Sequence, residues 1–172
     1  MAVLEILKYP DPRLRQVAKP VEQVTAETRA LVESMAETMY ANAGCGLAAN
    51  QVGIDARIFV IDTAAEGEPS ELKVFINPEI VKTDGVQMWE EGCLSFPGAT
   101  EEIRRAERVK VKALDQFGKP FELEATDLLA IAIQHENDHL NGVLMIDKLN
   151  ALRRRLVSRK VSRHLQDEAS QS

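Results

Sequence analysis

The stretch Asp127-Leu-Leu-Ala-Ile-Ala-Ile-Gln-His-Glu-Asn-Asp-His-Leu-Asn141 decides the fold of this 172-residue chain. Its first half is apolar all round, which is typical of a helix buried in a protein core. In its second half His135 and His139 are four residues apart, so both imidazoles project from one face of a helix. Gly142 then acts as a stop signal. We therefore predict a buried central helix that presents a pair of histidines.

Short segments rich in Val, Ile and Phe precede this helix, and Gly, Pro and Asp separate them. This pattern predicts short strands that are joined by turns and pair mainly antiparallel. The predicted strands are residues 56–61, 73–76, 80–82, 86–89, 101–104, 109–114 and 121–123.

Two further helices are predicted, one on each side of this region. Residues 25–42 have apolar side chains at helical spacing, Thr25 can cap the helix, and Gly44-Cys-Gly46 is expected to end it. Residues 149–165 form the last helix, and residues 166–172 are expected to fray. The fold class is therefore α+β, with short antiparallel β-sheets around the central helix and its His-Glu-x-x-His motif.

Composition excludes several classes of protein. The chain fits a single domain, which we place at residues 1–165. Its 21 basic and 27 acidic residues give a net charge of −6, which disfavours a nucleic-acid binder that uses its whole surface. No apolar run approaches the ~18 residues of a membrane helix, and no export signal is visible. We expect a cytoplasmic protein in which both cysteines are free thiols.

The segment His135-Glu-Asn-Asp-His139 predicts a metal site. One helical turn supplies two imidazole ligands and, in Glu136, a general base beside them. The alternative is a helix surface with scattered His and Glu. Cys93, in Glu91-Gly-Cys-Leu-Ser95, can complete a sulfur–nitrogen–nitrogen ligand set that leaves one position for water, although a small buried thiol is the competing interpretation.

Other choices of a third ligand fit the sequence less well. Thermolysin-like proteases place a Glu about twenty residues downstream, where this chain has Ser158-Arg-Lys160. The metzincin pattern requires a histidine where Met145 stands. The remaining histidine, His164, lies in the basic C-terminal helix and is a weak candidate.

Three motifs in order carry a resemblance to a known family: Gly44-Cys-Gly-Leu-Ala-Ala-Asn-Gln51, Glu91-Gly-Cys-Leu-Ser95 and Gln134-His-Glu-Asn-Asp-His-Leu140. The chain resembles peptide deformylase, and Tyr9-Pro-Asp-Pro-Arg-Leu-Arg15 and the C-terminal helix are similar to bacterial type 1 members. The resemblance implies removal of the formyl group from formylmethionine on newly synthesised polypeptides, with release of formate.

The resemblance also implies a role for individual residues. Cys93, His135 and His139 bind the metal, and Glu136 moves the proton as a metal-bound water attacks the formyl carbon. Gln51 and the backbone N–H of Leu94 stabilise the oxyanion. The substrate-binding residues are expected to be Gly46 through its backbone, Cys45, Glu91, Ile131 and Ala132.

Some neighbours of these motifs are interpreted separately. Glu91 is expected to be a buried acid paired with Arg105, and Trp89 is expected in the core. Cys45 replaces the aliphatic residue that is usual in the family. Thr100 and the segment Gly98–Glu102 differ from a common type 1 pattern that carries an arginine there, which leaves the peptide preference beyond methionine open.

One divalent metal ion per chain is expected. The mixed His and Cys ligand set alone favours Zn²⁺. The resemblance implies iron, as Fe²⁺, in the cell, with Zn²⁺, Ni²⁺ or Co²⁺ able to substitute. The ligand types do not separate these ions.

The C-terminal helix suggests a partner. Between residues 149 and 165 it carries six bases and no acid: Arg153, Arg154, Arg155, Arg159, Lys160 and Arg163. One interpretation is contact with ribosomal RNA, where formylmethionyl nascent chains emerge; the other is a solvated helix face. The protein is expected to be a monomer without a membrane partner.

Two other functions compete with deformylation. A metalloendopeptidase would cleave internal peptide bonds, but the downstream ligand of that class is missing. A non-catalytic metal-binding protein at the ribosome would close the metal shell with a fourth ligand, for which Cys45 is the candidate. Glu136 argues against it, because a structural site has no use for a base beside its ligand.

Overall fold

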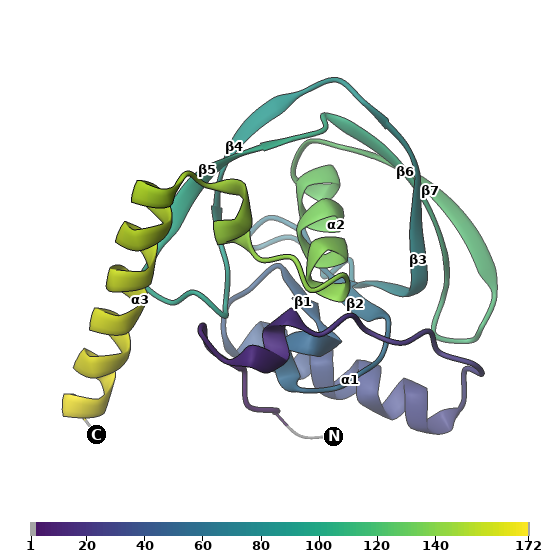
Figure 1. Ribbon diagram of the computed structural model, residues 1–172. Coiled ribbons are helices and arrows are strands. Elements are labelled where there is room, and N and C mark those ends of the chain that lie inside the picture. Colours follow the sequence, from purple (N-terminus) through teal and green to yellow (C-terminus); the bar gives the residue numbers. More distant parts are fainter. Residues whose placement is uncertain (1–2, 172) are drawn as a thin grey trace.

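The computed structural model describes residues 3–171, and its elements follow the predicted α+β order (Figure 1). The helices are α1 (Ala26–Ala41), α2 (Asp127–Leu140) and α3 (Ala151–Gln171), with short 3-10 turns η1 (Pro12–Arg15), η2 (Ala49–Val52) and η3 (Met145–Lys148). The strands are β1 (Gly46–Ala48), β2 (Ile58–Ile61), β3 (Lys73–Asp84), β4 (Gln87–Gly92), β5 (Thr100–Arg105), β6 (Arg108–Leu114) and β7 (Pro120–Thr126).

Two antiparallel sheets surround the central helix. The larger has the strand order β1-β2-β3-β6-β7, and β4 and β5 form a separate hairpin. Figure 1 shows α2 in the middle of the molecule, with the strands curving over it and α1 below. The first half of α2 packs on this sheet, where Ala130 and Ile133 join Phe59 and Phe75 in one apolar cluster. The prediction of a buried central helix is confirmed.

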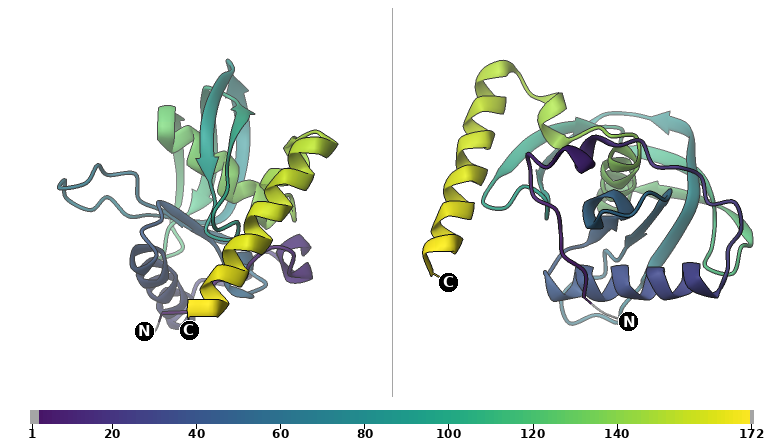
Figure 2. Two further views of the ribbon diagram at one scale, coloured as in Figure 1. Left: turned by 90° about the vertical axis from the view of Figure 1, so that its left-hand side faces the viewer. Right: turned by 60° about the horizontal axis from the view of Figure 1, so that its bottom comes forward.

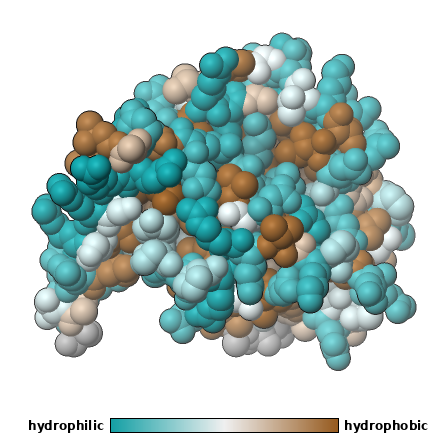
Figure 3. Space-filling model, viewed as in Figure 1, coloured by the Kyte–Doolittle hydropathy of each residue, from teal (hydrophilic) through white to brown (hydrophobic). Residues whose placement is uncertain are grey.

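Two other apolar clusters hold the outer helices. The α1 residues Val32, Met35 and Met39 pack with β1 and β2. The α3 residues Val157 and Val161 pack with η3 and with Phe96, which follows β4. Figure 2 shows α3 running along the outside of the molecule. The surface seen in Figure 3 is mostly hydrophilic, with apolar side chains dispersed over it. Within residues 3–171 no helix combines the length and apolar character needed to cross a bilayer.

Two strands differ from the prediction. The predicted segments 73–76 and 80–82 belong to one strand, β3, whose pairing with β6 shifts register twice. The apolar pattern breaks at Asn77-Pro78, where Asn77 has a φ of 51°, and the sequence therefore suggests two strands where backbone pairing maintains one. Strand β1 was not predicted, because three residues are too few to display an alternating pattern.

The helix ends can also be compared with the prediction. The predicted helix 25–42 is confirmed to within one residue at each end, since α1 covers Ala26–Ala41 and Thr25 caps it. Gly44 takes part in ending the helix: its N–H donates to the Met39 carbonyl at 3.0 Å, after Ala43 has taken the left-handed conformation with a φ of 54°. Ser172 lies outside the described residues, and residues 166–171, which were expected to fray, continue α3 to Gln171. Its last turns gain an i,i+4 contact between His164 Nε2 and Glu168 Oε1 at 3.1 Å.

Candidate metal centre

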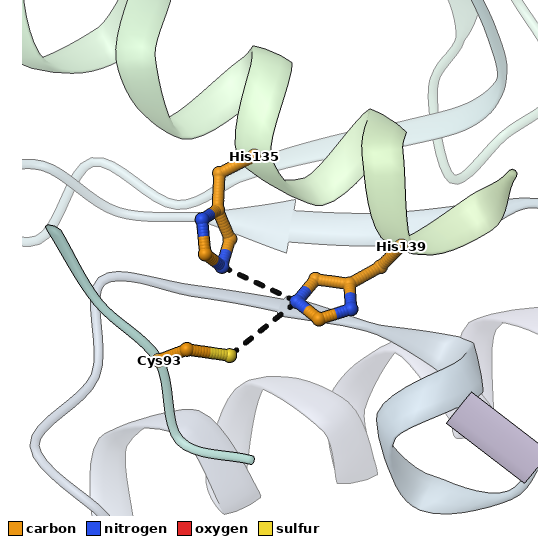
Figure 4. Close-up of side chains that lie close together, drawn as sticks. All are labelled: Cys93, His135 and His139. Atoms are coloured by element: carbon orange, nitrogen blue, oxygen red, sulfur yellow. Dashed lines mark hydrogen bonds between the residues drawn. The ribbon is translucent and has the colours of Figure 1, made fainter. Parts of the chain in front are cut away.

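Three potential ligands from two parts of the chain meet at one point (Figure 4). His135 and His139 project from α2, and Cys93 lies in the turn directly after β4. His139 Nε2 lies 3.2 Å from His135 Nε2 and 3.4 Å from Cys93 Sγ, and all three ligand atoms lie within 4.8 Å of one another. Both histidines are buried.

Two of the three separations are those expected around one tetrahedral ion. Bonds of about 2.05 Å to nitrogen and 2.3 Å to sulfur place two nitrogens about 3.3 Å apart and nitrogen and sulfur about 3.6 Å apart. The observed 3.2 Å and 3.4 Å are close to these values. Three protein donors leave one position of such an ion for water or substrate, which is the pattern of catalytic rather than structural sites.

Glu136 lies beside the first ligand and is almost fully buried, with 4% of its surface exposed. Its Oε1 has no hydrogen-bond partner among the described residues. Burial raises the pKa of Glu136 to about 7, with the carboxylates of Glu91 and Asp138 adding to the effect and His135 and Arg105 opposing it. A carboxyl group with this pKa can both take and return a proton near neutral pH.

Glu91 contacts the ring nitrogen of His135 that does not face the ligand cluster. Its Oε1 lies 2.9 Å from His135 Nδ1, while Arg105 donates from Nε to Oε2 at 2.8 Å and from Nη2 to Oε1 at 2.9 Å. Burial alone would raise the pKa of Glu91, but the hydrogen bonds from Arg105 and His135 lower it to about 2. The carboxylate is therefore ionised at neutral pH and orients Nε2 of His135 toward the ligand cluster.

Gln51 and Leu94 lie on the other side of the cluster. The Gln51 amide is fixed at both ends: Oε1 accepts the Ala48 N–H at 2.9 Å, and Nε2 lies 3.1 Å from Ser95 Oγ and 3.6 Å from Cys93 Sγ. This turns an N–H donor toward the metal ligands. The Leu94 backbone N–H makes no hydrogen bond with any residue in the described part of the chain. Two donors thus lie beside Cys93.

A cavity of about 460 Å³ reaches the cluster. The sequence-predicted residues along it are Cys45, Gly46, Gln51, Glu91, Cys93, Leu94, Ile131, Ala132, His135 and Glu136. His139 does not line it. The cavity is mostly apolar near Ile131 and Ala132, which suits an aliphatic or thioether side chain.

Sequence reasoning misplaced one cavity residue and missed others. Trp89 was expected in the core, but it is 38% exposed and lines the cavity. Its strand, β4, pairs only with β5, and this leaves the indole beside the cavity. Leu128 and Phe96 also line the cavity. Leu128 was detectable, because it precedes Ile131 by three residues and His135 by seven on one helix face.

Two possible extra ligands lie elsewhere. Cys45 is exposed and does not belong to the cluster of ligand atoms found in residues 3–171. His164 lies on α3 and contacts Glu168 instead. The structure therefore brings together the predicted set of Cys93, His135 and His139 and gives no support to a closed shell that includes Cys45.

Comparison with known proteins agrees with this geometry. A family model described as polypeptide deformylase matches residues 3–155. The chain is 51% identical over 163 residues to a peptide deformylase of Alkalilimnicola ehrlichii. The alignment covers 95% of the chain and 91% of that relative. It is 53% identical over 163 residues to a peptide deformylase of Chromobacterium violaceum. This alignment covers 95% of the chain and 96% of that relative.

Solved structures extend the similarity to three dimensions. A crystal structure of a peptide deformylase from Legionella pneumophila superposes with a TM-score of 0.93 at 47% sequence identity. The match covers 98% of each chain. Likeness at this level includes the α2 helix and both sheets.

Proposed function

The chain belongs to the peptide deformylase family, in its type 1 class, and on that basis we propose how the residues of its metal site divide the work. Its activity is that of a peptide deformylase (EC 3.5.1.88), a hydrolase with a metal-binding site, and the family implies formylated peptides as substrates. We propose that the substrate is the formylmethionyl end of newly made polypeptides, and that residues 1–165 form one catalytic domain.

Cys93, His135 and His139 would hold one divalent metal ion. When bound, such an ion supplies Lewis acidity and lowers the pKa of water. We propose Fe²⁺ as the ion in the cell, with Zn²⁺, Ni²⁺ or Co²⁺ as substitutes. The thiolate of Cys93 and the neutral imidazoles suit all of these ions.

Glu136 is the proposed general base and general acid. Its buried carboxyl, with a pKa of about 7, accepts the proton of the attacking water and delivers it to the amine that leaves. The unpartnered Oε1 is the atom available for this transfer.

Gln51 and the Leu94 N–H are proposed to stabilise the negative charge that develops on the formyl oxygen. The Gln51 amide is pre-oriented by the Ala48 N–H, so no reorganisation is needed when the charge appears. Loss of one such donor typically costs ~3–4 kcal/mol of transition-state stabilisation.

The remaining cavity residues are proposed to bind the substrate. Ile131 and Ala132 would contact the methionine side chain, and Gly46 would bind the peptide backbone from the free edge of β1. Cys45 lies between Gly44 and Gly46, lines the same cavity and would border the bound peptide. Glu91 would affect the substrate only indirectly, because it contacts His135.

The observation that carries the proposal is the convergence of Cys93, His135 and His139 beside the buried Glu136, whose Oε1 has no hydrogen-bond partner within residues 3–171. The test is formate release from a formyl-Met tripeptide by anaerobically prepared, Fe²⁺- or Ni²⁺-loaded protein. We expect formate from the native chain, almost none from Glu136→Ala, and a native rate from Glu124→Gln, an exposed glutamate on β7. Metal-loaded native protein that released no formate would refute the assignment.

The ribosome is the proposed partner of α3, and the cytoplasm is the proposed location. Two of the six bases have partners on the protein: Arg153 pairs with Glu101 at 3.0 Å, and Arg154 donates to the carbonyl of Ile146 at 3.2 Å. The other four, Arg155, Arg159, Lys160 and Arg163, are exposed. Their positive charge suits contact with RNA phosphates, which weakens steeply with salt.

Co-sedimentation with ribosomes tests this partner. Replacing Arg155, Arg159, Lys160 and Arg163 together by Gln is expected to abolish binding at low salt and to leave formate release from tripeptides unchanged. Equal sedimentation of the native and substituted chains would show that these side chains form only a solvated helix face. Sedimentation equilibrium on the native chain tests the expected monomer.

A further inference from the structure

Behind the metal site, alternating charges form a row that leads from His135 toward the surface. Glu91 contacts His135 Nδ1 and is held by two nitrogens of Arg105. On its other side, Arg105 Nη1 lies 2.5 Å from Asp138 Oδ2, and Lys148 Nζ lies 3.4 Å from that same oxygen. The row joins α2, β4, β5 and η3, four elements that are separate in the sequence.

The row changes from buried to hydrated along its length. The side chains of Arg105 and Glu91 are 3% and 4% exposed, whereas those of Asp138 and Lys148 are 24% and 34% exposed. The outer two line a second cavity, of about 370 Å³, on the far side of Arg105 from the ligands. Substitutions there remove little apolar packing, so their effect on the metal site can be measured in a folded protein.

Asp138 determines how Arg105 can sit. A guanidinium group is planar, and carboxylates on two of its edges fix both its position and its plane. Glu91 Oε1 is shared, because it accepts from Arg105 Nη2 and also contacts His135 Nδ1. Rotation of Arg105 would therefore move the acceptor that orients His135. Lys148 neutralises Asp138 and restricts its movement.

We propose that Asp138 and Lys148 are positioning residues for the metal ligand His135 and act through Arg105 and Glu91. The inference rests on the ligand set assigned under the proposed function. Partners in direct contact with a ligand typically change metal affinity 10–100-fold, and Asp138 and Lys148 lie beyond that contact. Their effects lie at the lower end of this range and below it, and they diminish from Asp138 to Lys148.

The test is the Zn²⁺ dissociation constant of the full chain, measured by competition with the dye 4-(2-pyridylazo)resorcinol. We expect Zn²⁺ to bind about tenfold more weakly to Asp138→Asn and about threefold more weakly to Lys148→Met than to the native chain. Lys148→Arg keeps the charge and is expected to bind as the native chain does. The matched control is Arg104→Met, which alters a base that lines the same cavity and has no ion pair within residues 3–171.

Zn²⁺ affinities of Asp138→Asn and Lys148→Met within twofold of the native value would overturn the proposal. The melting temperature of each metal-free variant separates positioning from folding. If that of Asp138→Asn falls by more than a few degrees, Lys148→Met and its rescue by Lys148→Arg decide the matter. Formate release is measured separately. A native chain that binds Zn²⁺ but releases no formate refutes the proposed function, while the Zn²⁺ affinities of the variants still test the positioning role of Asp138 and Lys148. A native chain that binds no Zn²⁺ refutes both.

Discussion

Gly46 on β1 lies directly against the carboxylate of Glu136 on α2. A methyl group in place of a Gly46 hydrogen would come 2.6 Å from Glu136 Oε2 and 3.1 Å from its Cδ. Real Cβ atoms do not approach other atoms this closely, so the Glu136 carboxylate would have to move if position 46 carried a side chain. Glycine at the edge of the sheet therefore lets the proposed base keep its position.

Gly46→Ala is expected to lower kcat/KM for a formyl-Met tripeptide at least about tenfold, equivalent to about 1.4 kcal/mol of transition-state stabilisation. The methyl group displaces the Glu136 carboxylate but contacts none of the three ligands, so bound metal per chain should stay at the native level. Steady-state kinetics and metal analysis on the same preparation check both statements. A variant with kcat/KM within twofold of native would contradict the steric argument.

Glu136→Gln is expected to change how the stability of the metal-free protein depends on pH. The folded-state pKa of Glu136 is raised from 4.5 to about 7, so the folded protein binds more protons than the unfolded chain between these values. The contribution of Glu136 to stability is therefore fully present below pH 4.5 and is lost as pH rises toward 7. The shift corresponds to roughly 3 kcal/mol as an upper limit. Because an amide at position 136 does not titrate, Glu136→Gln lacks this dependence of stability on pH.

Urea unfolding at intervals from pH 4.5 to 7.5 measures the difference. The free energy of unfolding of Glu136→Gln, relative to native, should increase through this interval. Glu124→Gln, at an exposed position, serves as the matched control and should show no such trend. Parallel curves for native and Glu136→Gln would mean that Glu136 ionises in the folded protein as it does in the unfolded chain.

Replacement of the two cysteines is expected to affect metal binding differently. Cys93→Ser replaces a thiolate within the ligand cluster by a neutral hydroxyl and should weaken Zn²⁺ binding by at least about 100-fold, since hydroxyl groups are poor ligands for this ion. Cys45→Ser lies outside the cluster and should retain one metal ion per chain. Dialysis followed by metal analysis distinguishes them. Loss of metal from Cys45→Ser would instead support the alternative of a non-catalytic site, in which Cys45 is a fourth metal ligand.

The sequence predicts the parts of this site that depend on local spacing. His135 and His139 meet because four residues make about one helical turn. Cys93 was a candidate third ligand from its loop position, and the family resemblance favoured it over the alternative of a buried thiol. Trp89 was misplaced, because its environment depends on how the β4–β5 hairpin stands relative to α2, which no local pattern encodes. Contact between Lys148 and Asp138 was equally invisible, since it requires the position of η3 against the completed helix.

The strands show the same division. Short segments rich in Val, Ile and Phe between turn residues located most of the sheet, but β1 has only three residues. The edge position that makes Gly46 important exists only once β2 pairs with β1. The break at Asn77-Pro78 looked like the end of a strand, whereas β6 pairs with β3 on both sides of it. Long-range pairing overrides local pattern at these points.

Glu91 is expected to make the metal-free protein sensitive to acid. Its pKa falls from 4.5 in the unfolded chain to about 2 in the folded protein. The unfolded chain therefore binds more protons between these values, so the contribution of Glu91 is present above pH 4.5 and is lost as pH falls toward 2. The shift corresponds to at most about 3 kcal/mol. Acid titration followed by circular dichroism should show this loss in the native chain.

Glu91→Gln removes the group that titrates but leaves Arg105 with only Asp138 as a charged partner. The variant should be less stable than native at pH 7, because a buried charge has lost its main counter-ion, and the difference should narrow as pH falls from 4.5 to 2. The matched control is Glu124→Gln, at an exposed position on β7, and its acid sensitivity should remain native. A stability difference between Glu91→Gln and native that stayed constant from pH 7 to pH 2 would show that protonation of Glu91 does not drive acid unfolding.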